Sequence, residues 1–123
     1  MVKNRHIHIP IKYVKKGWGY EKWIINKSEY CGKLLYFYAG KKCSWHKHAL
    51  KDEVFYLQSG RMIVRYGEDD SIEKAEELML EPGMNFYVYP GLRHQMEALE
   101  ASELFEFSTE HFDDDSYRLI KGD

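Results

Sequence analysis

Two neighbouring stretches of the sequence carry residues that could bind a metal ion together. His46 and His48 are separated by one residue, so on a β-strand their side chains point to the same face. A loop of four residues then leads to Glu53, whose carboxylate can return to the two histidines. Neutral imidazoles with one carboxylate suit Fe, Mn, Zn, Ni or Co. This segment therefore predicts a site for one divalent transition metal ion.

A later segment supplies a fourth candidate ligand. The aromatic run 86–89 ends at Pro90 and Gly91, and His94 comes just after them. Pro and Gly together favour a tight turn, which can reverse the chain and aim His94 at the first two histidines. The predicted metal ligands are therefore His46, His48, Glu53 and His94.

Two other groups of metal-ligand residue types are not assigned to this site. His6 and His8 have the same one-residue separation, but no carboxylate follows at a useful spacing, and we expect an exposed pair on an edge or arm. Cys31 and Cys43 lie far apart and form no C-x-x-C motif. We expect both to be reduced thiols in a cytoplasmic protein, because disulfides are rare in that compartment.

The elements that must position these residues are β-strands. Aromatic residues make up 15% of the chain, and aromatic side chains suit half-buried, pleated surfaces. Short apolar runs recur between turn residues such as Ser59-Gly60 and Pro82-Gly83. This pattern predicts an all-β sandwich or barrel. The expected strands span residues 33–39, 54–58, 61–66, 76–80, 86–89, 94–99 and 103–108.

Length and composition narrow the classes of protein. The 123 residues suit a single domain over 1–123. We expect 1–15 to form an N-terminal arm or extra strand, and 109–123 an acidic tail or short helix that closes one end of the barrel. The first residues contain no apolar segment typical of a secretory leader, and we expect none; no apolar run approaches the ~20 residues of a membrane helix, so we expect no membrane span. Basic residues gather in the first half and acidic ones in the second, but in a barrel the halves interleave, so no nucleic-acid partner is expected.

Residues 40–60 resemble the first motif of the cupin superfamily, G-x5-H-x-H-x3-4-E-x6-G, without a mismatch. The second motif, G-x5-P-x-G-x2-H-x3-N, matches at Gly83, Gly91 and His94, but Tyr89 stands at the first proline and Ala98 at the final asparagine. The resemblance covers residues 33–108. It implies a single-domain cupin, which is a double-stranded β-helix or jelly-roll barrel, with one metal ion held by the four residues named above.

The two ends of the chain resemble the type II mannose-6-phosphate isomerase cupins. Residues 16–21, Lys-Gly-Trp-Gly-Tyr-Glu, are similar to the K-P-W-G-x-E opening of that group, with Gly17 in place of proline. Residues 104–118 are similar to its closing pattern, in which a strand bearing Glu is followed by an acidic stretch and an Arg. This resemblance implies that the substrate is a small sugar or sugar phosphate.

Within this resemblance, Glu106 is the candidate catalytic residue. Aldose–ketose isomerisation needs a side chain that moves a proton between neighbouring carbons, and burial in an apolar barrel would raise the pKa of Glu106 toward that work. The alternative is that Glu106 pairs with Arg118 or a lysine and only holds the tail. Arg118 is a candidate anion contact, unless it pairs with Asp113–Asp115. Trp18 is a candidate for stacking on a sugar ring, unless it packs in the core.

Three functions follow from these observations. We favour a metal-dependent, isomerase-like cupin that stabilises an enediol of a small sugar or sugar phosphate. One alternative is an Fe-dependent dioxygenase, because three histidines and one glutamate leave coordination positions open to O2 and substrate. The other is a non-enzymatic cupin that binds a carbohydrate or another small ligand. The resemblance also implies a homodimer, in which we expect the N-terminal strand to be the element exchanged between subunits.

Overall fold

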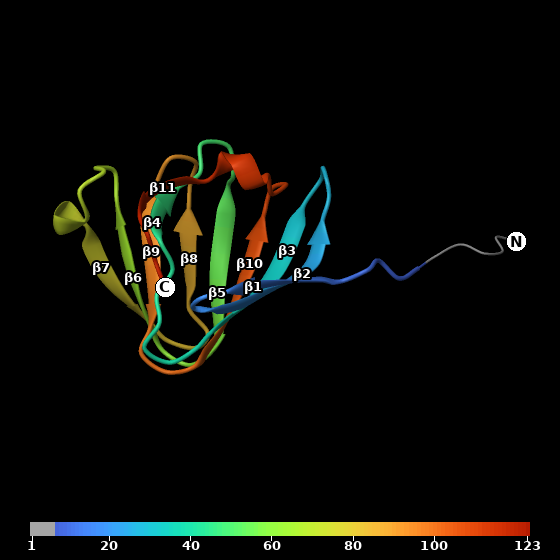
Figure 1. Cartoon of the computed structure of the whole chain (residues 1–123), viewed down its shortest axis with the longest axis horizontal. Coiled ribbons are helices and arrows are strands. Elements are labelled where there is room, and N and C mark those ends of the chain that lie inside the picture. The colour runs from blue at the N-terminus through green and yellow to red at the C-terminus, as the bar shows by residue number, and fades with distance from the viewer. Residues whose placement is uncertain (1–6) are drawn as a thin grey trace, which may run out of the picture.

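Two antiparallel β-sheets face each other in the computed structural model, which describes residues 7–123 (Figure 1). The six-stranded sheet has the order β1 (Lys12–Lys16), β2 (Gly19–Asn26), β3 (Cys31–Phe37), β10 (Ser102–Ser108), β5 (Glu53–Ser59) and β8 (Asn85–Val88). The five-stranded sheet has the order β11 (Tyr117–Ile120), β4 (Trp45–Lys47), β9 (Arg93–Ala98), β6 (Met62–Gly67) and β7 (Glu76–Leu80). This arrangement confirms the predicted all-β jelly roll.

The core lies between the two sheets and is built by strand alternation. In β5, Phe55 and Leu57 are buried, while the alternate residues Val54, Tyr56 and Gln58 are half-buried or exposed. Met62 and Val64 of β6 repeat the pattern on the opposite sheet. Because successive side chains of a strand point to opposite faces, each strand contributes every second residue to the interior. The same rule turns any polar residue at an inward position toward the interior.

All seven strands expected from the sequence are present, with ends shifted by no more than two residues. Strands β2 and β11 were not predicted. In β2 the residues that face inward include Glu21 and Trp23, so an apolar alternation is absent from the sequence. All four residues of β11 are exposed, and this strand exists through its pairing with β4, in which Arg118 lies opposite His46.

The first residues of the described chain lead into β1, which pairs antiparallel with β2. Of the predicted histidine pair, His8 is exposed, whereas His6 lies outside the described residues. The turn between β1 and β2 contains Trp18, whose ring stacks on Phe37 with centroids 4.1 Å apart. Gly19 follows with φ of 154°, and a Cβ there would lie 1.7 Å from the carbonyl oxygen of Tyr36. Only glycine allows this close approach to β3.

Short helical turns complete the fold. One spans Ile72–Lys74 and the other spans Asp113–Asp115. The second turn and β11 occupy the segment that was expected to be a tail or short helix, and they lie across one end of the sandwich (Figure 1). Among residues 7–123, no helix has the length and apolar character needed to cross a membrane.

Candidate metal centre

Three imidazoles meet at the end of the sandwich where β4 and β9 pair. His46 of β4 lies directly opposite His94 of β9, and their ring centroids are 4.4 Å apart. His48 follows β4 with its ring 4.9 Å from that of His46. One nitrogen of each ring can be chosen so that all three lie within 4.8 Å of one another. This three-histidine group has the donor atoms and the spacing to hold a metal ion.

A tight turn delivers His94 to this position. The amide of Leu92 donates to the carbonyl of Tyr89 at 3.1 Å, and Gly91 between them has φ of 92°. A positive φ at the third position, after proline at the second, defines a type II turn, which glycine favours. The amide of Gly91 also donates to the carbonyl of His48 at 2.7 Å. The turn therefore joins the two motif segments directly through the backbone.

The surroundings of the three rings fix which nitrogen carries the proton. Each Nδ1 lies within hydrogen-bond distance of a backbone carbonyl, namely His46 to Ser44 (2.9 Å), His48 to Asp115 (2.8 Å) and His94 to Leu92 (3.0 Å). A carbonyl only accepts hydrogen bonds, so Nδ1 carries the hydrogen in each neutral ring. Each Nε2 then keeps its lone pair for a cation. Histidines that bind metals are commonly oriented in this way by their second nitrogen.

Glu53, the first residue of β5, brings a carboxylate from the opposite sheet. Its Oε2 lies 3.7 Å from Nε2 of His48 and 3.5 Å from Nε2 of His94. Within residues 7–123, neither carboxylate oxygen of Glu53 has a hydrogen-bond partner, and nor does Nε2 of His94. Leaving such atoms buried and unpaired is costly, and one cation among them would pair all three. The residues therefore fit a divalent metal ion.

The titration behaviour of the four residues agrees with this arrangement. Burial lowers the pKa of His48 to about 3 and holds that of His94 well below its ordinary value, and the neighbouring histidines add to both effects. Burial also lowers the pKa of His46. The rings are thus neutral donors at neutral pH. Burial and the nearby Glu106 raise the pKa of Glu53 well above its ordinary value, which a bound cation would reverse.

Asp115 holds the loop that joins His48 to Glu53. Its carboxylate accepts hydrogen bonds from the amides of Ala49 (2.9 Å), Leu50 (3.1 Å) and Lys51 (3.1 Å). Its own carbonyl accepts the hydrogen bond from Nδ1 of His48. The turn Asp113–Asp115 therefore positions His48 and the first three residues of the ligand loop, although it lies more than sixty residues further along the chain.

A second group of buried charges lines the neighbouring wall, on β3 and β10. Glu106 accepts hydrogen bonds from Lys51 and Ser108, each at 3.0 Å. Burial alone would raise the pKa of Glu106, but Lys51, Lys33 and these hydrogen bonds together lower it to about 2. The predicted upward shift is therefore wrong, because a buried lysine sits against the carboxylate. Glu106 pairs with a lysine, as the alternative for this residue allowed.

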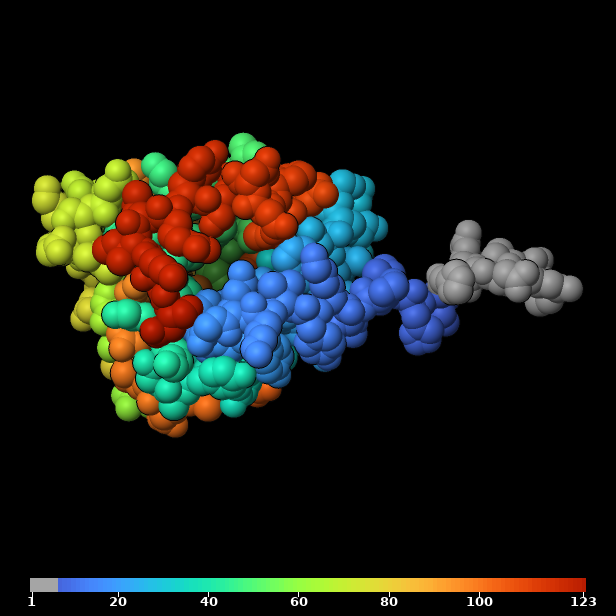
Figure 2. All heavy atoms as spheres, viewed as in Figure 1, coloured from blue at the N-terminus to red at the C-terminus, as the bar shows by residue number. Residues whose placement is uncertain are grey.

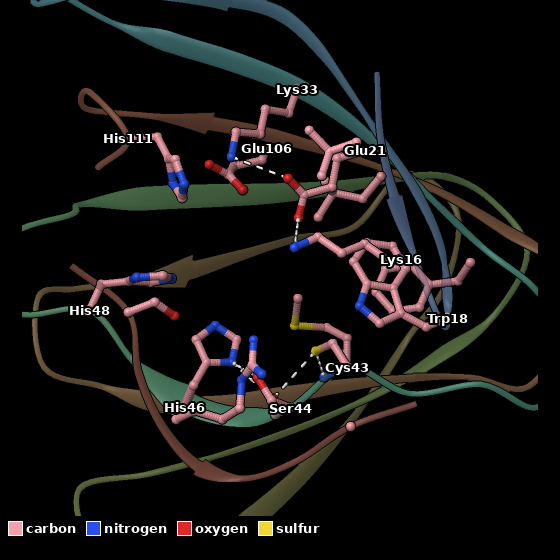
Figure 3. A pocket seen from close by; sticks show the side chains of 18 of the residues that line it. Lys16, Trp18, Glu21, Lys33, Cys43, Ser44, His46, His48, Glu106 and His111 are labelled. Carbon is pink, nitrogen blue, oxygen red and sulfur yellow. Dashed lines mark hydrogen bonds and ion pairs between the residues drawn. The ribbon is translucent and has the colours of Figure 1, made fainter. Parts of the chain in front are cut away.

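Both walls face one cavity of about 810 Å³. Its mouth lies between the N-terminal strands and the C-terminal segment, which appear blue and red in Figure 2. Figure 3 shows His46 and His48 on one side of this space and Glu106, Lys33 and Glu21 on the other. A metal ion on the three-histidine group would therefore be reachable by a molecule in the cavity.

The two predicted substrate residues also line this cavity. Trp18 does so while its ring stacks on Phe37, so it serves the core and the cavity wall together. Arg118 lies opposite His46 in the pairing of β11 with β4. Among the described residues Arg118 forms no ion pair with Asp113–Asp115, which leaves its guanidinium available to a ligand.

Sequence reasoning missed several residues of this site. Lys51 lies within the ligand loop and Lys33 within a predicted strand, but a lysine is rarely buried and gave no signal. The strand alternation that placed Glu106 inward also places Lys33 inward, since the two lie opposite each other in register. Asp115 carried no signal, because its role depends on contacts between distant parts of the chain.

Comparison with known proteins agrees with this description. The family model described as "Cupin domain" matches residues 34–107. That stretch contains the three-histidine group, Glu53 and Glu106. None of the curated proteins matches the chain.

Several solved structures share the fold. The capsular polysaccharide assembling protein CapF from Staphylococcus aureus superposes with a TM-score of 0.79 at 18% identity, over 93% of this chain and 33% of that one. KdgF from Halomonas sp. superposes with a TM-score of 0.67 at 22% identity, over 77% of this chain and 81% of that one. Bacillus subtilis oxalate decarboxylase, a protein with Mn(II) centres, superposes with a TM-score of 0.76 at 17% identity, over 89% of this chain and 30% of that one. The chain thus spans about a third of the CapF and oxalate decarboxylase chains.

Proposed function

Since the chain belongs to the cupin domain family, we propose that it is a metal-dependent protein that acts on a small, negatively charged sugar, with an isomerase-like reaction. The observation that carries this proposal is the composition of the cavity. It joins the three-histidine group to a wall of buried ionic side chains, and basic residues outnumber acidic ones around it. The basic residues are Lys12, Lys15, Lys16, Lys33, Lys51, Arg118 and Lys121, and the acidic ones Glu21, Glu53, Glu106, Asp113 and Asp123.

The location of the two terminal segments supports a sugar phosphate. Residues 16–21 and 104–118 resemble the ends of type II mannose-6-phosphate isomerase cupins, and both segments contribute side chains to this one cavity. Lys16 reaches toward Glu21 at 3.9 Å, and Arg118 comes from β11. A phosphate near Lys16 or Arg118 would gain charge-assisted hydrogen bonds. CapF, which shares the fold, is named for capsular polysaccharide assembly.

In this proposal, His46, His48, His94 and Glu53 would hold the metal ion. As a Lewis acid, the metal would stabilise the negative charge that builds on the sugar oxygens during enediol formation. Glu106 is the proposed proton carrier: its carboxylate takes the proton from the hydroxyl-bearing carbon beside the carbonyl and returns it to the former carbonyl carbon, while the hydroxyl proton passes to the former carbonyl oxygen. With Lys51 at 3.0 Å this carboxylate is a weak base. A bound anionic sugar must therefore draw the Lys51 ammonium away, which would raise the pKa of Glu106.

Two wider expectations stay proposals. Cys31 and Cys43 are both buried free thiols, which is compatible with the reducing cytoplasm that we propose as the protein's location. Burial raises the pKa of Cys43 to about 12, so this thiol is unreactive. The proposed homodimer is tested by the molecular mass of the purified protein in solution.

An assay of the metal-loaded protein tests the proposed function. The protein is loaded with Mn or Fe and incubated with mannose 6-phosphate in D2O. The proposal expects fructose 6-phosphate and deuterium in the recovered sugar, and neither product with Glu106→Gln. The matched control is Glu103→Gln, a change on the same strand at a residue outside the cavity lining.

The same assay separates the two alternatives. Oxygen uptake that depends on an added substrate would contradict the isomerase and support a dioxygenase. Sugar binding without turnover or deuterium exchange would support a non-enzymatic binding protein.

A further inference from the structure

His111 is the fourth histidine that lines the cavity, and contacts hold both its backbone and its ring in place. Its amide donates to the side chain of Asn26 at 2.8 Å, and the Asn26 amide group donates back to the carbonyl of His111 at 3.1 Å. Its ring packs edge-on against Trp23, with centroids 5.0 Å apart. Nε2 lies 3.0 Å from Oδ1 of Asp113. A side chain this constrained has a defined orientation toward the cavity.

The second ring nitrogen of His111, Nδ1, can only accept a hydrogen bond while the ring is neutral. The Asp113 carboxylate accepts hydrogen bonds, so Nε2 carries the hydrogen and Nδ1 keeps its lone pair in the neutral ring. Burial lowers the pKa of His111, and the charges of Lys51 and Lys33 lower it further, so the ring is neutral at neutral pH. Nδ1 is therefore a hydrogen-bond acceptor. This orientation is the reverse of that in the three-histidine group, where Nδ1 carries the hydrogen.

Nδ1 of His111 belongs to a small set of atoms. Among residues 7–123, the buried side-chain nitrogen and oxygen atoms without a hydrogen-bond partner are the two carboxylate oxygens of Glu53, Nε2 of His94 and Nδ1 of His111. Three of these four atoms belong to the candidate metal centre. The fourth lies in the wall of the same cavity. Figure 3 shows the His111 ring extending into this space between His48 and Glu106.

We propose that Nδ1 of His111 accepts a hydrogen bond from a hydroxyl group of the sugar bound in this cavity. The inference rests on the proposed function for the identity of the ligand. A lone pair in a buried wall is satisfied by an O–H or N–H donor, and a sugar offers several hydroxyl groups. A small dianion such as oxalate offers none at neutral pH. His111 thus selects hydroxylated ligands over other metal-binding anions of similar charge.

Calorimetry with two probes tests this selection in the zinc-loaded protein. Mannose 6-phosphate carries hydroxyl donors, whereas oxalate binds through carboxylates alone. His111→Phe keeps an aromatic ring against Trp23 and removes Nδ1. We expect this variant to bind mannose 6-phosphate about 5- to 100-fold more weakly, and oxalate and zinc as the wild type does. His8→Phe, at an exposed position, is the matched control and is expected to change neither affinity.

Two further measurements keep the test decisive. His111→Gln retains an acceptor oxygen and is expected to recover part of the lost affinity. The 15N spectrum of the wild type is expected to show His111 protonated on Nε2 and bare on Nδ1. Equal affinities in wild type and His111→Phe, an equal loss for both probes, or a proton on Nδ1 would each overturn the proposal for His111 and leave the sugar site standing. A wild type that binds oxalate but not mannose 6-phosphate would overturn the proposed function together with this inference.

Discussion

On one wall of the cavity, Lys51 and Glu106 neutralise each other across 3.0 Å, whereas on the other wall Glu53 and His94 keep buried atoms unpaired. Both walls contain buried polar side chains, Lys33, Lys51 and Glu106 on one and His48, Glu53 and His94 on the other. They differ in charge balance: the lysine wall contains its own cations, whereas the histidine wall contains metal-ligand donors and the carboxylate of Glu53. The nearest cation to that carboxylate is Lys51, at 3.9 Å and already hydrogen-bonded to Glu106. The lysine wall is therefore complete as folded, while the histidine wall has the composition of a cation site.

Removing the Lys51 cation from the lysine wall is expected to have the largest effect on stability. Lys51→Met leaves Glu106 without its closest cation and is expected to lower the free energy of unfolding by about 3–5 kcal/mol, because a buried carboxylate would lack its partner. Urea unfolding of the metal-free protein measures this loss, and Lys41→Met at an exposed position is the control. Adding Glu106→Gln to Lys51→Met should recover part of the loss. A cost below about 1 kcal/mol would mean that the wall does not depend on this pair.

Adding a metal ion to the histidine wall should stabilise the protein. At zinc concentrations a hundredfold above the dissociation constant, we expect the free energy of unfolding to rise by about 3 kcal/mol, since only the folded state presents the assembled ligands. Thermal and urea unfolding with and without zinc measure the gain. The variant His48→Ala should lose most of it. A gain that is equal in wild type and variant would place the zinc elsewhere on the protein.

The contact that aligns the ligand loop comes next in size. Asp115→Asn removes a carboxylate that accepts three backbone amides, so we expect a loss of about 1–3 kcal/mol in stability and about tenfold in metal affinity. The absorption spectrum of the Co(II) form should also change, because the orientation of His48 depends on the same residue. Asp114→Asn, at the exposed neighbouring position, is the control. Unchanged cobalt affinity and spectrum would show that the loop holds its shape without Asp115.

A further prediction is a pH dependence of the stability of the metal-free protein. Burial lowers the pKa of all three histidines of the group, that of His48 to about 3, while histidines of an unfolded chain titrate near 6.5. As the pH falls from about 6.5 toward 3, the histidines bind protons in the unfolded chain but not in the folded one. The free energy of unfolding therefore decreases as the pH falls. Glu53, with its raised pKa, acts in the opposite sense, but it is one group against three.

Urea unfolding at pH 7 and pH 5 measures this slope. His48→Gln should make the slope shallower, whereas His8→Ala should leave it unchanged. A metal-free protein that is as stable at pH 5 as at pH 7 would contradict the buried, neutral state of the three rings.

The sequence predicted much of the histidine wall and little of the lysine wall, for a physical reason. Metal-ligand residue types at a fixed spacing are visible in one dimension, and strand alternation then indicates their direction, as for His46 and His48. The position of Glu53 follows from the short loop after His48. The position of His94 follows from the tight turn that Pro90 and Gly91 indicate. The fold followed from the regular apolar alternation of seven strands. The prediction of the cupin fold is confirmed by the family match over residues 34–107.

The remaining features depend on contacts between distant segments. Lys51 meets Glu106 across 55 positions of the chain, and Asp115 meets the ligand loop across more than sixty. Neither pairing has a local pattern. The raised pKa expected for Glu106 failed for this reason, since a buried lysine on another element decided the sign. Strand β11 was not predicted, because all of its residues are exposed and its sequence shows no apolar alternation.

Metal analysis of the wild type beside the double variant Glu53→Ala/His94→Ala tests the central claim most directly. Each purified protein is stripped of metal, incubated with a slight excess of Mn, Fe or Zn, and freed of unbound ions before elemental analysis. We expect one tightly bound ion per wild-type chain and less than a tenth of that occupancy in a folded double variant. Full occupancy in the double variant, or an empty wild type under every metal, would contradict the assignment of the metal centre.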